Sequence, residues 1–190
     1  MRLHSRLVPL IACLLASGAA LAHPGGHAES SFAVGLAHPF SGLDHLLAML
    51  AVGLWATQLG GRNLLVIPAS FVTSMALGAL IGISGFQLPY METGVSLSVL
   101  VLGLLIAFAV QGSRPMGVAL VGMFALFHGY AHGIELPASS AGAFPGFLLA
   151  TAMLHGFGVT AGWLLQKRGA IVRTGGAAIG LAGAWLLLAA

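Results

Sequence analysis

Long apolar stretches alternate with short polar breaks along the chain from residue 41 to residue 189. Each stretch is close to the roughly 20 residues that an α-helix needs to cross the hydrocarbon core of a bilayer. The breaks contain Gly, Pro, Asn and Ser, which are typical of loops. We therefore expect an all-α integral membrane protein. The predicted transmembrane helices are six, at residues 41–59, 64–84, 93–111, 116–134, 144–165 and 171–189.

The first 22 residues have a different pattern, which is typical of a secretory signal peptide. Two arginines come within the first six residues, residues 7–15 are apolar, and a small-residue cleavage site ends at Ala22. We predict cleavage after Ala22, so that residues 23–190 form a six-helix transmembrane domain. Cleavage would remove Cys13, the only cysteine, so we expect neither disulfides nor thiolate metal ligands in the mature protein.

The overall composition supports a membrane protein and excludes several other classes. Of the 190 residues, 58% are hydrophobic and only 6% are charged, and the mean hydropathy is +1.02. A soluble globular protein carries about 25% charged residues, so this chain has too few for a soluble enzyme or a disordered segment. The net charge is +3, but the seven Lys and Arg are scattered, which argues against nucleic acid as a partner.

The positive charges predict how the helices are oriented. All Lys and Arg residues beyond the signal peptide lie in or beside the first, third and fifth predicted loops. By the positive-inside rule this side faces the cytoplasm. We therefore place both ends of the mature chain in the periplasm, with the helices in a bacterial cytoplasmic (inner) membrane. The positive residues are Arg62, Arg114, Lys167, Arg168 and Arg173.

The histidines and carboxylates are distributed unevenly over this topology. After residue 22, all of them except His155 fall on the predicted periplasmic side or in the outer part of a span. Ionisable groups at membrane depth are costly and usually face a cavity, so each is a candidate for function. These residues are His23, His27, Glu29, His38, Asp44, His45, Glu92, His128, His132, Glu135 and His155.

The first group of candidates is the segment His38-Pro-Phe-Ser-Gly-Leu-Asp-His45. Pro39 disfavours an α-helix at His38, so we expect the helix to begin near Ser41, with Ser41 and Asp44 acting as a capping box. His38 can then fold back over the helix start toward Asp44 and His45. The alternative is that Asp44 only caps the helix dipole and His45 anchors at the level of the lipid headgroups.

The second group is the segment Phe127-His-Gly-Tyr-Ala-His-Gly-Ile-Glu135. His128, His132 and Glu135 are spaced i, i+4 and i+7, which places them in a stripe about 60° wide on one helix face. Imidazole and carboxylate ligands together suit borderline divalent ions such as Ni²⁺, Co²⁺ and Zn²⁺. The alternative is a pair of histidines that hydrogen-bond to neighbouring helices.

Several further residues carry a weaker signal. His155 lies near mid-depth of the fifth predicted span, either as the next ligand inward or as a packed core histidine. Glu92 opens the third span, where it either caps the helix or binds metal. His23 and His27 either capture metal or belong to a disordered terminus. A polar stripe in the second span indicates interhelical hydrogen bonds or a pathway, and consists of Ser70, Thr73 and Ser74.

With these residues in view, the sequence resembles the HupE/UreJ family of bacterial nickel permeases over essentially the whole mature chain. Residues 38–45 match the first-span motif of that family and residues 127–135 match its fourth-span motif. The resemblance implies a secondary permease that imports Ni²⁺ from periplasm to cytoplasm, often for hydrogenase or urease assembly, with some relatives tied to cobalt. It implies functional roles for His38, Asp44, His45, His128, His132 and Glu135, and less directly for Glu92 and Phe71.

Other functional classes fit the sequence less well. It contains neither His-Glu-x-x-His nor Gly-x-Ser-x-Gly, so an intramembrane protease is not supported. His128 and His132 share one helix face, which suits one small ion better than two stacked haems. The phosphate-binding loop of an ATPase is also missing, so the chain is not an ATP-driven pump by itself.

These observations define the expected activity and partners. We expect a transporter and not an enzyme, with no permanently bound cofactor and with Ni²⁺ or Co²⁺ as the transported substrate. The expected partners are the divalent ion and the lipid bilayer, and the sequence indicates no ATPase subunit. A cobalt importer and a metal-sensing or structural membrane subunit stay open as alternatives, and the sequence does not determine the oligomeric state.

Overall fold

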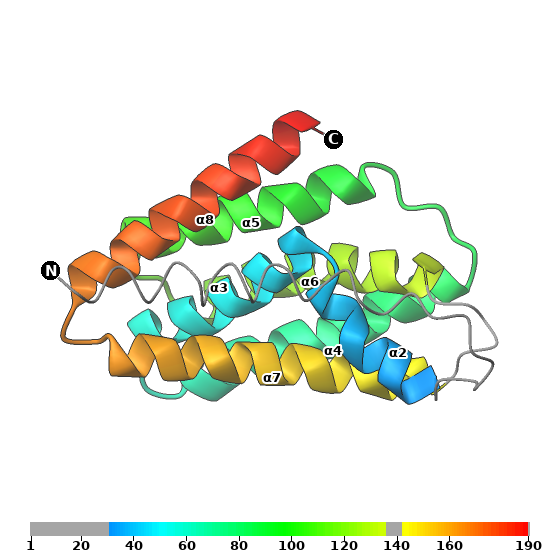
Figure 1. Cartoon of the computed structure of the whole chain (residues 1–190), viewed down its shortest axis with the longest axis horizontal. Coiled ribbons are helices and arrows are strands. Elements are labelled where there is room, and N and C mark those ends of the chain that lie inside the picture. The colour runs from blue at the N-terminus through cyan, green and yellow to red at the C-terminus, as the bar shows by residue number, and fades with distance from the viewer. Residues whose placement is uncertain (1–30, 136–141, 190) are drawn as a thin grey trace, which may run out of the picture.

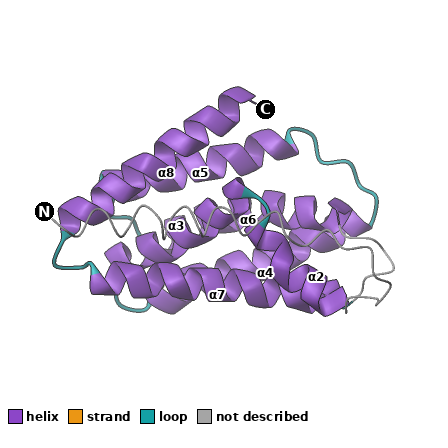
Figure 2. Cartoon of the chain, viewed as in Figure 1, coloured by secondary structure: helices purple, strands orange, loops and turns teal. Residues whose placement is uncertain are grey.

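The computed structural model describes residues 31–135 and 142–189. All regular secondary structure of the described residues is helical (Figure 1), and Figure 2 shows helices joined by loops, with no strand among them. The predicted signal peptide and the candidate ligands His23 and His27 lie outside the described residues. The helices are α2 (Ser31–Ala37), the 3-10 helix η2 (His38–Phe40), α3 (Leu43–Leu59), α4 (Asn63–Ile83), α5 (Met91–Ala107), α6 (Arg114–Glu135), α7 (Ala143–Leu164) and α8 (Gly169–Ala189).

The six predicted spans coincide with α3 to α8, and their ends differ by only a few residues. Four of these helices, α4, α6, α7 and α8, are 21 or 22 residues long and apolar enough to cross a membrane. Helix α5 is apolar but has only 17 residues, and α3 passes the same test only when it is joined to the preceding α2–η2 segment. The described residues thus contain four candidate spans, or five with the joined pair, and the six-span topology stays a prediction.

The chain bends sharply before α3, and the hydropathy pattern did not predict this bend. Helix α2 and η2 together make an angle of 82° with α3. The α-helical hydrogen bonding ends at Ala37 and a 3-10 turn begins at His38, in agreement with the expected effect of Pro39. Helix α2 packs against α7, where Gly35 and Gly146 allow the two backbones to touch. The bend brings His38 to the side of the bundle where α6 ends.

The expected capping box at the start of α3 is wrong. The helix begins at Leu43 with Gly42 as its N-cap, and no side chain caps it. The hydroxyl of Ser41 instead donates a hydrogen bond to the carbonyl of His38 at 2.6 Å, because the 3-10 turn places that carbonyl nearby. The carboxylate of Asp44 is occupied by the next residue, His45.

The helices associate in close pairs, α4 with α6, α5 with α8, and α3 with α7. In Figure 1, α5 and α8 run side by side along one edge of the bundle, and α7 lies near the opposite edge. Helix α3 contacts α4, α5, α7 and α8 and therefore lies centrally. Gly129 and Gly133 of α6 lie directly against the main chain of Met75 and Ala79 in α4. Such small residues are needed because helix association in lipid depends on close packing.

Candidate metal site

The ionisable side chains of the two sequence motifs meet at one end of the bundle. His38 lies in η2 and His45 lies in the first turn of α3, so the two residues flank the bend. His128, His132 and Glu135 lie in the last two turns of α6, on the face that meets these histidines. The structure thus brings together the six residues that the sequence singled out as ligands, from segments about 90 residues apart. We call them the histidine cluster: His38, Asp44, His45, His128, His132 and Glu135.

The outer part of the histidine cluster consists of His38, His132 and Glu135. Nε2 of His38 lies 2.9 Å from Oε2 of Glu135, so the imidazole donates to the carboxylate. One donor atom from each of the three residues lies within 4.8 Å of the others, a spacing from which a single metal ion can be held. His132 is buried, whereas His38 and Glu135 are partly open to the outside. An ion can therefore reach this group from the end of the bundle.

Asp44 orients His45 from the neighbouring position in the chain. Its Oδ1 accepts hydrogen bonds from the backbone N–H of His45 at 2.7 Å and from Nδ1 at 2.8 Å. Because Nδ1 carries the donated proton, the lone pair of the ring lies on Nε2. Nε2 of His45 is buried and has no hydrogen-bond partner among the described residues. A carboxylate that holds one nitrogen of an imidazole while the other faces an ion is a common arrangement at metal sites.

His128 occupies the deepest position of the histidine cluster and is fully buried. Its Nε2 lies 2.7 Å from the hydroxyl of Ser98 in α5, and its Nδ1 has no partner among the described residues. The ring centroid of His45 lies 4.7 Å from that of His128 and 4.4 Å from that of His132. His45 therefore connects the deep histidine to the outer group.

His132 is the least satisfied polar side chain of the cluster. Neither of its ring nitrogens has a hydrogen-bond partner among the described residues, although the residue is 1% exposed. Its ring stacks on Phe147 of α7 at a centroid distance of 4.9 Å and touches His38 edge-on at the same distance. Leaving a buried polar group without a partner costs about 1–3 kcal/mol. That cost is offset if an ion supplies the missing contact.

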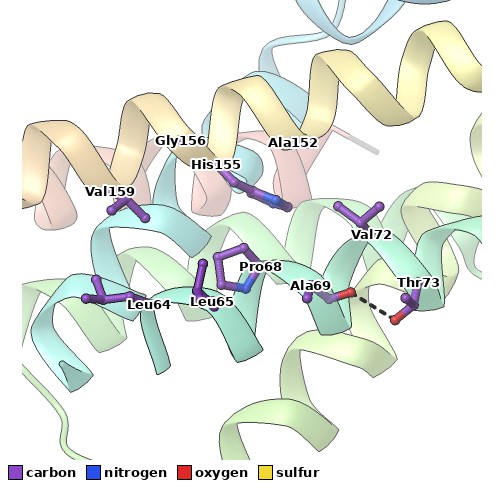
Figure 3. Close-up of a pocket in the computed structure, with 10 residues that line it drawn as sticks. All are labelled: Leu64, Leu65, Pro68, Ala69, Val72, Thr73, Ala152, His155, Gly156 and Val159. Carbon is purple, nitrogen blue, oxygen red and sulfur yellow. Dashed lines mark hydrogen bonds between the residues drawn. The ribbon is translucent and has the colours of Figure 1, made fainter. Parts of the chain in front are cut away.

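His155 lies next to the histidine cluster and is linked to it through Phe71. The ring centroid of Phe71 lies 5.6 Å from that of His128 and 5.0 Å from that of His155, so Phe71 contacts both imidazoles. Figure 3 shows the side chain of His155 between α7 and α4, where it borders a largely apolar cavity of about 460 Å³. Both ring nitrogens of His155 are buried without a partner among the described residues. Among the described residues, His155 is not part of the group of three whose donor atoms lie within 4.8 Å of one another.

The polar stripe of the second predicted span forms bonds within its own helix. The hydroxyl of Ser70 donates to the carbonyl of Ile67 at 2.7 Å, and that of Thr73 donates to Ala69 at 2.9 Å. Ser74 faces Gly122 of α6. The structure therefore does not bring these side chains to the histidine cluster.

Glu92 lies in the first turn of α5, where Tyr90 and not Glu92 is the N-cap residue. It borders a cavity of about 290 Å³ that Asp44, His45 and Glu135 also line. The cavity adjoins the cluster and brings a third carboxylate to the same end of the bundle. Glu92 therefore lies beside the histidine cluster, but no hydrogen bond joins it to a histidine among the described residues.

Ser98 contacts the histidine cluster, which the sequence does not predict. It is one of two serines in the apolar helix α5, it is fully buried, and its hydroxyl lies 2.7 Å from Nε2 of His128. Nothing in its local sequence distinguishes it from Ser96, two residues earlier. Only the packing of α5 against α6 shows which of the two serines meets a histidine.

The charges of the described residues are separated along the bundle. Helix α6 runs from Arg114 to Glu135, a length of about 32 Å at 1.5 Å per residue. Arg114 bonds to Asn63 at the start of α4, and Arg173 bonds to the carbonyl of Ala107 at the end of α5. These cations lie at the end opposite to the histidine cluster, so they do not neutralise the carboxylates of the cluster.

Comparison with known proteins gives two matches. The family model described as HupE / UreJ protein matches residues 11–186. A relative named Protein HupE, from Rhizobium leguminosarum bv. viciae, is 48% identical over 189 residues, which cover 97% of this chain and 98% of that protein. No solved structure matches.

Proposed function

The chain belongs to the HupE/UreJ family, which is associated with nickel and cobalt transport, and we propose that it imports Ni²⁺ across the bacterial cytoplasmic membrane as a secondary transporter. The imported ion would serve the assembly of a hydrogenase or urease metal centre. The transport runs from the periplasm to the cytoplasm and needs no ATPase partner.

The observation that carries this proposal is the group His38, His132 and Glu135, whose donor atoms lie within 4.8 Å of one another at one end of an apolar helix bundle. Two imidazoles and one carboxylate match the preference of borderline divalent ions. Mg²⁺ and Ca²⁺ prefer sites built from oxygen ligands, so this group would bind them less tightly. The same ligands suit Co²⁺, which is why a cobalt importer is the second candidate.

The direction of transport is supported by the separation of charge. The histidine cluster lies at the end of α6 and at the start of α3, and Arg114 lies at the other end of α6. If the positive end faces the cytoplasm, the ligands face the periplasm, where an ion would first be captured. In this topology α3 to α8 are six membrane-crossing helices and both termini of the mature chain are periplasmic.

The membrane potential is sufficient to drive this import. A charge gains about 2.3 kcal/mol per 100 mV, so a divalent ion gains about 4.6 kcal/mol when it enters a negative cytoplasm. That free energy corresponds to about three decades of concentration. Ligands of the cluster replace water around the ion, and the cationic end lacks such ligands, so it would release the ion.

The proposal is tested by metal accumulation in cells that lack their other nickel importers, with and without this protein. We expect the protein to raise cellular Ni²⁺ at limiting supply, with Co²⁺ next and Zn²⁺ least. A preference for Co²⁺ would favour the second candidate. Metal that binds the purified protein but is not accumulated by the cells would contradict transport and favour a sensing subunit.

A further inference from the structure

We propose that the histidine cluster contains a second, inner ion position made only of imidazoles, formed by His45, His128 and His132, and that Ser98 is the positioning residue that turns Nδ1 of His128 toward it. This inference rests on the proposed function and deepens it. The outer position, with His38 and Glu135, receives the ion first, and His132 belongs to both.

The hydrogen bond of Ser98 determines which nitrogen of His128 is available. The hydroxyl of Ser98 donates its only hydrogen to the carbonyl of Val95 at 2.6 Å, one turn earlier in α5. Toward His128, at 2.7 Å, the same oxygen can then only accept. Nε2 of His128 therefore carries the proton, and the lone pair lies on Nδ1, which is buried and has no partner among the described residues.

His45 is held in the same manner, with the opposite nitrogen free. Its Nδ1 donates to Asp44, so the lone pair lies on Nε2, which is also buried without a partner among the described residues. Two histidines from different helices are thus each fixed by one hydrogen bond in the tautomer that leaves a lone pair unused. Hydrogen bonds of this kind, from residues that do not bind the ion, orient imidazoles at metal sites.

The separations of His45 from His128 and from His132 are close to those of imidazoles that share one ion. Two imidazoles that bind one ion at about 2.1 Å have ring centroids about 4.5 to 5.3 Å apart, for ligand angles of about 90° to 110°. The centroid distances are 4.7 Å for His45 and His128 and 4.4 Å for His45 and His132. Among the described residues only the outer group already brings three donor atoms within 4.8 Å of one another, so the side chains of the inner position must move closer together to hold an ion.

His132 connects the two positions because both of its nitrogens are free. It lies between His38, at 4.9 Å, and His45, at 4.4 Å, by ring centroids. His128 lies one helical turn before His132 in α6, about 6 Å deeper in the bundle. An ion that passes from the outer to the inner position exchanges a carboxylate ligand for neutral imidazoles. The inner position holds the ion without a direct anionic ligand and disfavours ions that require oxygen ligands.

The test is Ni²⁺ binding to the purified full chain in lipid nanodiscs, measured by equilibrium dialysis in a Glu135→Gln background. Glu135→Gln removes the outer carboxylate, and we expect it to retain binding of one Ni²⁺ at the inner position. Adding Ser98→Ala should then weaken binding about 10- to 100-fold, the usual effect of losing a residue that orients a metal ligand. Ser98→Thr, which keeps the hydroxyl, should restore it.

Ser84→Ala is the matched control. The hydroxyl of Ser84 also donates to a carbonyl three residues earlier, but Ser84 is the C-cap residue of α4 and has no hydrogen bond to a histidine among the described residues. This variant should leave binding unchanged. Binding that is abolished by Glu135→Gln alone, or that is unaffected by Ser98→Ala, would overturn the inner position. A wild-type protein that binds no Ni²⁺ would instead contradict the proposed function itself.

A second measurement is independent of the folding of any variant. Nitrogen NMR of the metal-free wild type, labelled with ¹⁵N-histidine, reports the tautomer of each imidazole. We expect His128 to carry its proton on Nε2 and His45 to carry its proton on Nδ1. A proton on Nδ1 of His128 would overturn the inference.

Discussion

We expect Asp44 to act on a bound ion through its charge as well as through its hydrogen bonds to His45. The variant Asp44→Asn keeps the shape of the side chain and one acceptor oxygen but removes the charge. We expect the initial rate of Ni²⁺ uptake at limiting metal to fall about 10- to 100-fold, because the carboxylate both attracts the ion and makes His45 a better ligand. The measurement is uptake normalised to the amount of protein in the membrane. Normal uptake would show that the charge of Asp44 is not needed.

His132 and His155 form a natural pair for comparison. Both are buried, and both have two ring nitrogens without a partner among the described residues, but only His132 lies in the histidine cluster. His132→Ala should abolish uptake at limiting Ni²⁺ with near-normal membrane levels. His155→Ala, which removes a side chain of the same size from the core, should have a milder effect. Equal losses in the two variants would indicate a packing role for both.

The sequence predicts the residues of the cluster better than their pairing. The spacing of His128, His132 and Glu135 indicates that they share a face of one helix, and in the structure all three face η2 and α3. The spacing does not indicate that Glu135 pairs with His38, 97 residues away, because that contact depends on the bend before α3. Long-range contacts of this kind follow from tertiary packing, which local periodicity does not describe.

At the scale of the helices, the segment before α3 shows where pattern analysis fails. Helix α2 has only seven residues, too few to cross a membrane or to show a clear helical period. Pro39 indicated a break but not its angle. The 82° turn follows from the packing of α2 on α7, where two glycines allow contact between the backbones.

The close approach of α4 and α6 predicts a large difference between two glycine substitutions. A methyl group at Gly129 would overlap the carbonyl of Met75, whereas one at Gly156 would meet nothing within 4 Å. We expect Gly129→Ala to destabilise the protein by about 1–3 kcal/mol through overpacking. Gly156→Ala should be neutral or stabilising by up to about 1 kcal/mol, because alanine favours a helix.

Thermal unfolding of the two variants in the same detergent measures this difference. Gly156→Ala serves as the control for the helix propensity of alanine. If both variants unfold at the temperature of the wild type, the two helices are further apart than the structure shows.

At the scale of the whole molecule, hydropathy predicts the positions of the long helices, but not how they pack. The apolar residues of α3 and α7 surround each helix on all sides, so no face indicates a neighbour. The pairs α4 with α6 and α5 with α8 therefore could not be deduced from the sequence. The single end at which the ligands gather could be deduced, because charge and ligand residues fall on opposite sides of the predicted topology.

The orientation of the bundle is tested by reporter fusions on the two sides. A fusion at Arg114, the first residue of α6, should be active as a cytoplasmic reporter. A fusion at Gln87, between α4 and α5, should report the periplasm, because the positive-inside rule places that loop outside. The reverse result would place the histidine cluster at the cytoplasmic end and contradict import by capture from the periplasm.

Entry of Ni²⁺ into sealed vesicles that contain only the purified protein tests the central claim most directly. A potassium gradient with valinomycin sets the potential, and a trapped dye reports the ion. We predict that an interior negative by 100 mV drives Ni²⁺ inward without ATP, since the potential supplies about 4.6 kcal/mol. Vesicles with His132→Ala should show no more entry than empty ones. Entry that is independent of the potential, or equal for His132→Ala and the wild type, would contradict transport through the histidine cluster.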